Sequence, residues 1–347
     1  MATSTTKKGR KAVIGSATNF WLHSTSQGFD LTHPPTPDAP LVYPRMPLEC
    51  TTSRVTIDPA KTALIVVDMQ NFFLNPALGR PRDSKGLVAC EQLVKHAIPA
   101  CRKAGIQIIY VNWGLTQEEI DVMPPATLRA FGFETVSEDD GDESSKEAAE
   151  DDHGINTGVT DALKKLPPKP AMGKDPRLYR GLGTEIGHLE LDDGSKVDGG
   201  RLLMRDQWNA ALYPTLEEIR RPEDVWIHKN RLVNYCHHIN IDMLTLHRMS
   251  GLWGGGTLCT QYLESTGIRS LLFAGVNTDQ CVGGSLQDAF SRGYDCLLLS
   301  DGCATTSPAS SQQSIEYNAA KTYGFALTCD ELEKGAGKVQ QHGPDSS

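Results

Sequence analysis

The chain has 347 residues and a formal net charge of −9 at neutral pH. Most of that charge lies in residues 138–152, a run with nine acids and one lysine. The remainder is nearly neutral, which argues against a nucleic-acid partner. No stretch approaches the ~20 apolar residues of a membrane span, so we expect no membrane partner either.

The acidic run predicts a solvated, disordered insertion, which we place at 134–156, rather than a binding site for cations. The nine cysteines are an odd number without a C-x-x-C pair, which favours a reduced intracellular protein. The first 29 residues are basic and lack acids, a weak similarity to a transit peptide. Gly9 and Gly15 would interrupt the amphipathic helix of such a peptide, so we expect a cytoplasmic protein.

Residues 1–57 contain repeated prolines and predict an extended N-terminal arm rather than an independent domain. Its cluster Phe20, Trp21 and Leu22 predicts docking on an apolar surface, such as a neighbouring subunit. We expect one folded domain over 58–332 and a loose polar tail over 333–347.

Within the domain, apolar runs of strand length alternate with segments of helical pattern. A hairpin is expected at 188–197 with its turn at Asp193 and Gly194, inside a segment 183–213 that would form a lid or an inter-subunit wall. Fully apolar strands alternating with helices predict an α/β fold: a doubly wound, mostly parallel six-stranded sheet with helices on both faces. The expected strands are 62–68, 106–112, 225–229, 269–276, 294–301 and 325–328, and the expected helices are 87–104 (kinked by Pro99, ended by Gly105), 241–249, 258–265, 281–293 and 310–322.

Three reactive side chains follow these strands at their carboxyl ends, where ligands bind in parallel sheets. Asp68 ends the first strand, Lys229 ends the third, and Cys281 follows the fourth. A cysteine that opens a helix lies at the positive end of the helix dipole, which favours the thiolate. A carboxylate could accept its proton while an ammonium group compensates the charge. Taken singly, Asp68 could be a turn cap, Lys229 a surface lysine and Cys281 a buried structural cysteine.

The motifs around these three residues are similar to those of the isochorismatase-like cysteine hydrolase superfamily. The similar segments are 66–73 (VVDMQNFF), 229–231 (KNR) and 275–282 (GVNTDQCV). The resemblance implies that Asp68 is the general base, Lys229 its charge partner and Cys281 the nucleophile. It also implies a cis peptide between Val276 and Asn277, an oxyanion hole formed by the N–H groups of Asn277 and Cys281, and a homo-oligomer, either dimer or tetramer.

The sequence departs from some members of this family at positions that bear on metal binding and on the kind of bond that is cleaved. No histidine follows the second strand until His153, so we expect no metal and no other cofactor. Members that cleave a vinyl ether lack the cysteine, so Cys281 favours hydrolysis of a C–N bond through a thioester. The nearest relatives would be the metal-free ureidoacrylate, biuret and carbamoylsarcosine amidohydrolases, which implies a small linear amide or ureido substrate that releases ammonia or an amine. The candidate substrate-binding residues are Asn71, Phe73, Trp113, Trp208 and Tyr235.

Other interpretations stay open. An ether or lactam hydrolase on the same scaffold, or a catalytically idle ligand-binding member, would also fit the motifs. His237, His238 and His247 could form a metal cluster or supply a partner for the cysteine, although histidines beside helices more often make ordinary polar contacts.

Overall fold

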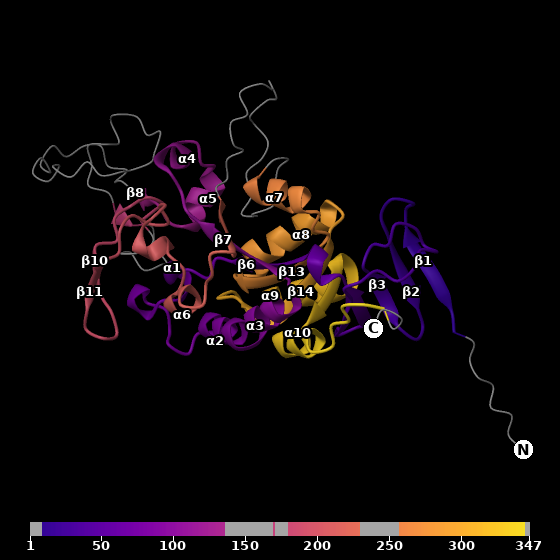
Figure 1. Ribbon diagram of the computed structural model, residues 1–347. Helices are drawn as coiled ribbons and strands as arrows, with labels where there is room; N and C mark the ends of the chain where they lie inside the picture. The colour runs from indigo at the N-terminus through magenta and orange to yellow at the C-terminus, as the bar shows by residue number, and fades with distance from the viewer. Residues whose placement is uncertain (1–8, 136–168, 171–179, 230–256, 344–347) are drawn as a thin grey trace, which may run out of the picture.

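The computed structural model describes residues 9–135, 169–170, 180–229 and 257–343. Its centre is a six-stranded sheet in the order β12-β7-β6-β13-β14-β15 (Figure 1). All five strand pairs are parallel, so the predicted α/β fold is confirmed. The strands are β6 (Thr62–Val67), β7 (Gln107–Trp113), β12 (Val225–Lys229), β13 (Ser270–Val276), β14 (Asp295–Ala304) and β15 (Gly324–Leu327).

The two central strands, β6 and β13, are buried at every position. This is expected of strands that have neighbours on both edges and helices on both faces. In Figure 1, α7 (Leu258–Thr266) and α8 (Gly283–Ser291) lie on one face of the sheet. The other face carries α2 (Lys85–Gln92), α3 (Ile98–Ala104) and α10 (Cys329–Ala336).

Three helical segments contain a π-helical turn, over Leu93–Ala97, Thr278–Val282 and Ala319–Tyr323. The first joins α2 to α3, so the predicted helix 87–104 is interrupted just before Pro99, and it ends as expected at Gly105 with φ +80°. The third follows α9 (Ala309–Asn318). The predicted helix 241–249 and the acidic run 138–152 lie outside the described residues.

The N-terminal segment is not an extended arm. It forms a five-stranded sheet in the order β1-β2-β3-β5-β4. Trp21 packs on Phe325 of the main sheet, with ring centroids 5.5 Å apart, and its Nε1 donates to Asp295 at 2.7 Å. The Phe20 cluster therefore docks on its own domain rather than needing a neighbouring subunit. The strands are β1 (Lys11–Gly15), β2 (Phe20–Ser24), β3 (Gly28–Leu31), β4 (Met46–Glu49) and β5 (Arg54–Ile57).

The C-terminal residues are also more ordered than predicted. Residues 333–336 belong to α10, which packs on β4, and Gln340 pairs with Arg45.

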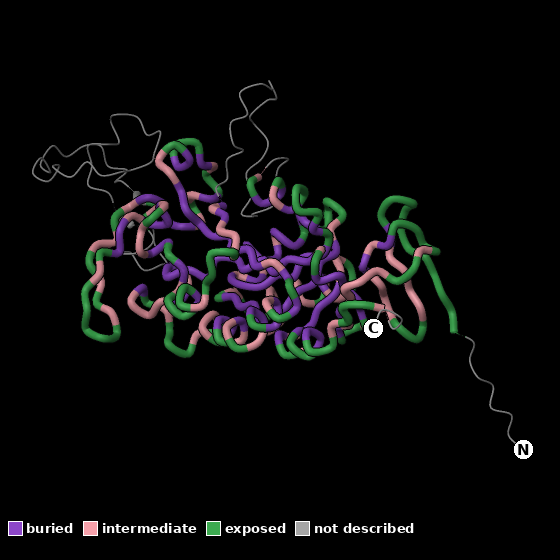
Figure 2. Tube along the Cα trace, in the orientation of Figure 1, coloured by how far each residue is buried: buried purple, intermediate pink, exposed green. Residues whose placement is uncertain are grey.

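The predicted hairpin is present as β10 (His188–Glu190) and β11 (Lys196–Asp198). Its tip is exposed, whereas the main sheet is buried (Figure 2). None of the described helices is both long and apolar enough to cross a membrane. The remaining short elements are α1 (Asn71–Leu74), α4 (Gln117–Asp121), α5 (Pro125–Ala130), α6 (Pro214–Glu217), β8 (Glu134–Thr135) and β9 (Lys169–Pro170).

Candidate active site

Asp68 marks the point where the chain leaves the main sheet. Strand β6 ends at Val67, and the Asp68 N–H still donates to the carbonyl of Val111 in β7, at 3.0 Å. The backbone of Asp68 then adopts a left-handed conformation, with φ +53°, which few non-glycine residues do. Its side chain is fully buried. The turn therefore fixes the carboxylate at the carboxyl edge of the sheet.

Lys229 is the direct partner of this carboxylate. Its Nζ lies 2.5 Å from Asp68 Oδ2 and 4.8 Å from the centroid of the Trp113 ring. Burial raises the pKa of Asp68, and the Lys229 charge opposes that rise. Burial lowers the pKa of Lys229, but the Asp68 carboxylate and the Cys281 thiol outweigh it and the net direction is up. The pKa of Asp68 is raised overall in spite of Lys229, and the two side chains form a buried ion pair.

Cys281 lies beside both charges. Asp68 and Lys229 both influence the pKa of its thiol, and the residue is buried. Burial raises the pKa of the thiol to about 12; Asp68 adds to the rise and Lys229 opposes it. The expectation of a thiolate is therefore corrected: at neutral pH the thiol of the free protein keeps its proton. Cys281 also does not open its helix, because it is the fourth residue of the π-helical turn Thr278–Val282.

The loop that carries Cys281 leaves strand β13 in a constrained geometry. The peptide bond between Val276 and Asn277 is cis, at the position implied by the family resemblance. Gly275 has φ +118°, and a Cβ there would collide with the Val67 carbonyl oxygen. The loop is tied to the end of β14 by a 2.5 Å hydrogen bond from Thr305 Oγ1 to Asp279. Close approach of β13 to β6 thus brings the Cys281 loop next to Asp68.

The candidate substrate-binding residues lie in different settings. Trp113 is buried beneath Lys229. Phe73 is half-buried and stacks edge-on against Phe72, with centroids 5.0 Å apart. Asn71 is buried, and its amide donates to the carbonyl of the half-buried Trp208 at 2.9 Å. Tyr235 lies outside the described residues.

Several polar atoms around these residues are buried without a hydrogen bond in the described parts of the chain. They are Asp68 Oδ1, Trp113 Nε1, Thr278 Oγ1 and both amide atoms of Asn112. Native proteins seldom leave such atoms unsatisfied, and each one needs an explanation. The sequence interpretation did not single out Asn112 or Thr278. The available signal for Asn112 was a polar residue near the end of an otherwise apolar strand.

A group with metal-ligand spacing occurs among the described residues, but it contains none of the three reactive side chains. It consists of His96, Asp330 and Glu333. His96 Nδ1 lies 2.5 Å from Glu333, and Asp330 is paired with Lys334 at 2.6 Å. The cluster is explained by these surface ion pairs. The histidines His237, His238 and His247 lie outside the described residues.

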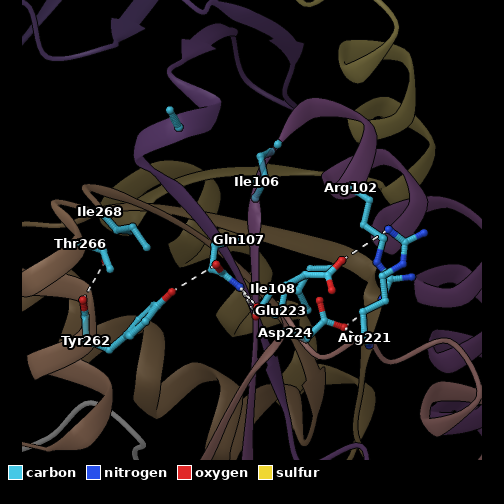
Figure 3. Close-up of a pocket in the computed structure, with 12 residues that line it drawn as sticks. Arg102, Ile106, Gln107, Ile108, Arg221, Glu223, Asp224, Tyr262, Thr266 and Ile268 are labelled. Carbon is cyan, nitrogen blue, oxygen red and sulfur yellow. Dashed lines mark hydrogen bonds and ion pairs between the residues drawn. The ribbon is translucent and has the colours of Figure 1, made fainter.

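A pocket of about 360 Å³ lies at the opposite edge of the sheet, near the amino ends of β6, β7, β12 and β13 (Figure 3). Its polar side chains are bonded to one another: Arg102 pairs with Asp224 at 2.9 Å, and Tyr262 donates to Gln107 at 3.2 Å. It contains none of the residues that the sequence predicts to be reactive. The three candidate reactive residues, Asp68, Lys229 and Cys281, lie at the carboxyl edge instead.

Known proteins resemble this chain over most of its length. The family model for the isochorismatase domain matches residues 190–330. The ureidoacrylate amidohydrolase RutB of Agrobacterium fabrum is 25% identical over 296 residues, covering 84% of this chain and 95% of that protein. The enzyme of the same name from Rhizobium rhizogenes is 24% identical over 284 residues, covering 80% of this chain and 84% of that protein.

Solved structures with a similar chain path include a cysteine hydrolase from Pseudomonas syringae, with a TM-score of 0.48 and 16% identity over 87% of this chain and 99% of that one. N-carbamoylsarcosine amidase from Thermoplasma acidophilum has a TM-score of 0.44 and 16% identity, covering 78% and 97% of the two chains. Residues 190–330 therefore match the isochorismatase domain, and the chain is similar over most of its length to enzymes named ureidoacrylate amidohydrolase.

Proposed function

We propose that this protein is a cysteine hydrolase that cleaves the C–N bond of a small linear amide or ureido compound through a thioester. The observation that carries the proposal is the buried Asp68–Lys229 pair, with Nζ and Oδ2 2.5 Å apart, close enough to the Cys281 thiol for both groups to influence its pKa. The curated relatives named ureidoacrylate amidohydrolase support the choice of a ureido substrate.

In the proposed reaction, Asp68 accepts the proton of Cys281 as the sulfur bonds to the substrate carbonyl carbon. The N–H groups of Asn277 and Cys281 would stabilise the oxyanion. When this intermediate collapses, the C–N bond breaks, and the leaving nitrogen takes the proton from Asp68. A water molecule, deprotonated by Asp68, then attacks the thioester; the acid leaves and the thiol regains its proton.

The protonated resting thiol fits this sequence of steps. Transfer of its proton to Asp68 converts one carboxylate into one thiolate, so the site holds one negative charge before and after. Lys229 faces that negative charge in both states, because it contacts Asp68 and Cys281 alike. A buried ammonium group beside both side chains therefore stabilises both states.

The buried unpaired polar atoms support a small, polar substrate. Trp113 Nε1 and Thr278 Oγ1 are hydrogen-bonding groups that lack a partner in the described residues, and we propose that a substrate supplies it. Phe73 and Trp208 would form walls of the site. We further propose that the protein works in the cytoplasm as a homo-oligomer.

The test is release of ammonia or amine from a panel of ureido acids, carbamoylated amino acids and primary amides. We expect wild-type turnover of at least one compound and a loss of more than about 10³-fold in Cys281→Ala. Mass spectrometry of a quenched wild-type reaction should show an acyl adduct on Cys281. Cys296→Ala is the matched control, because Cys296 is equally buried but lies within β14. Turnover that survives Cys281→Ala would exclude the thioester route.

A further inference from the structure

We infer that Gln70 is a positioning residue for the Asp68–Lys229 pair, an inference that rests on the proposed function. Its side chain is completely buried. The amide Nε2 donates to the carbonyl of Trp113 at 2.7 Å and to that of Ala210 at 2.5 Å. The amide oxygen accepts from the N–H of Trp113 at 2.9 Å. One side chain thus holds both backbone groups of Trp113.

The reason for this arrangement lies in how strand β6 ends. Val67 pairs with Val111 in the sheet, but the left-handed turn at Asp68 takes the chain away before Trp113 can find a strand partner on that side. The carboxamide of Gln70 carries a C=O and an N–H like a peptide group. It therefore replaces the missing strand, and Trp113 stays in register with Lys229 of β12 on its other side.

Trp113 touches both members of the charged pair. Its ring faces Lys229 Nζ at 4.8 Å, and its backbone amide lowers the pKa of the Asp68 carboxyl. The second N–H of Gln70 fixes Ala210, within the turn Trp208–Ala210. Loss of the amide would release Trp113 and this turn together. We expect Asp68 and Lys229 to lose their alignment with the thiol, and a displacement of about 1 Å can lower the rate about 10²-fold.

The substitutions Gln70→Leu and Gln70→Glu separate this role from general stability. The leucine variant should lower kcat about 10- to 100-fold with little change in KM. The glutamate variant should retain activity at low pH, where its protonated carboxyl can still donate and accept hydrogen bonds. As the pH rises, the carboxyl ionises and repels the two carbonyl oxygens, so activity should fall relative to wild type.

Gln107 provides the matched control. It lies at the start of the same strand, and its amide also donates to backbone carbonyls, those of Ile108 and Glu223. Gln107→Leu should also lower the melting temperature, though by less because Gln107 is only half-buried, while leaving kcat within about twofold of wild type. Equal kinetic losses in both leucine variants, or no loss in Gln70→Leu, would overturn the inference.

A readout that needs no substrate keeps this test separate from the proposed function. The rate of Cys281 alkylation by iodoacetamide, followed across pH by peptide mass mapping, reports on the groups around the thiol. Gln70→Leu should shift this pH profile, and Gln107→Leu should not. If no compound in the panel is hydrolysed but the shift appears, the proposed reaction fails and the positioning role stands. An unchanged profile in Gln70→Leu contradicts the positioning role.

Discussion

Lys229 holds its ammonium group between the Asp68 carboxylate and the face of the Trp113 ring. Burial raises the pKa of Asp68, and Lys229 is the main opposing influence. Lys229→Met removes that influence, so the pKa of Asp68 should rise further and the base should be protonated at neutral pH. We expect kcat/KM at pH 7 to fall at least about 100-fold.

The activity that remains in Lys229→Met should depend on pH in a predictable direction. A base with a higher pKa ionises at higher pH, so the acidic limb of the kcat/KM profile should move to higher pH in Lys229→Met. The pH–rate profile measures this directly. Lys61→Met is the control, because Lys61 pairs with Asp58 at the amino end of β6. An acidic limb in the same place as in wild type would show that Asp68 does not act as the base.

The positions of Asp68, Lys229 and Cys281 at one edge of the sheet could be predicted from the sequence because apolar strands end at or just before them. The state of the thiol could not. A helix start near Cys281 suggests a thiolate, but it gives no measure of burial, and burial raises the pKa of this thiol to about 12. Gln70 was missed for a similar reason: its partners, Trp113 and Ala210, are distant in the sequence.

At the scale of elements, α10 shows why the tail was predicted to be loose. Gly335 and Gly337 suggest a flexible end, yet Leu332, Gly335 and Ala336 are buried. Gly335 is the contact point with β4: a Cβ there would lie 2.5 Å from Leu48 Cδ2 and 2.8 Å from the Pro47 carbonyl oxygen. The glycine is present for close packing rather than for flexibility.

Gly335→Ala should therefore lower the free energy of unfolding by about 1–3 kcal/mol through overpacking. Gly337→Ala should have almost no effect or a slight stabilising one, because the nearest atom to a Cβ at that position is 3.4 Å away. Urea denaturation of the two variants provides the measurement. Equal stabilities would mean that α10 does not pack on β4 in solution.

At the scale of the whole molecule, the N-terminal sheet is part of the domain. Asp295, at the start of β14, accepts hydrogen bonds from Trp21 and Ser270 and pairs with His33 at 2.6 Å. Three of its pairings join neighbouring strands, but the pairing that unites the sheet is not local: β3 pairs in parallel with β5, while β4 lies at the edge. Short strands with prolines between them look like an extended arm when the partners are unknown.

Trp21→Phe retains an aromatic ring against Phe325 but removes one donor from the buried Asp295. We expect a loss of about 1–3 kcal/mol in the free energy of unfolding. We also expect one cooperative transition, with circular dichroism and tryptophan fluorescence giving the same midpoint. Two separate transitions would show that the N-terminal sheet unfolds independently of the main sheet.

The π-helical turn at Thr278–Val282 has a consequence for how the Cys281 loop can change in length. A π turn holds one residue more than an α turn, so the loss of a single residue between Asn277 and Cys281 would let the helix close as an ordinary α-helix. Each residue rotates a helix by about 100°, so the thiol would then point away from Asp68. Substitutions in this loop keep the residue count and so the direction of the thiol, whereas a one-codon deletion would turn the proposed nucleophile away from Asp68 while leaving the cysteine in the sequence.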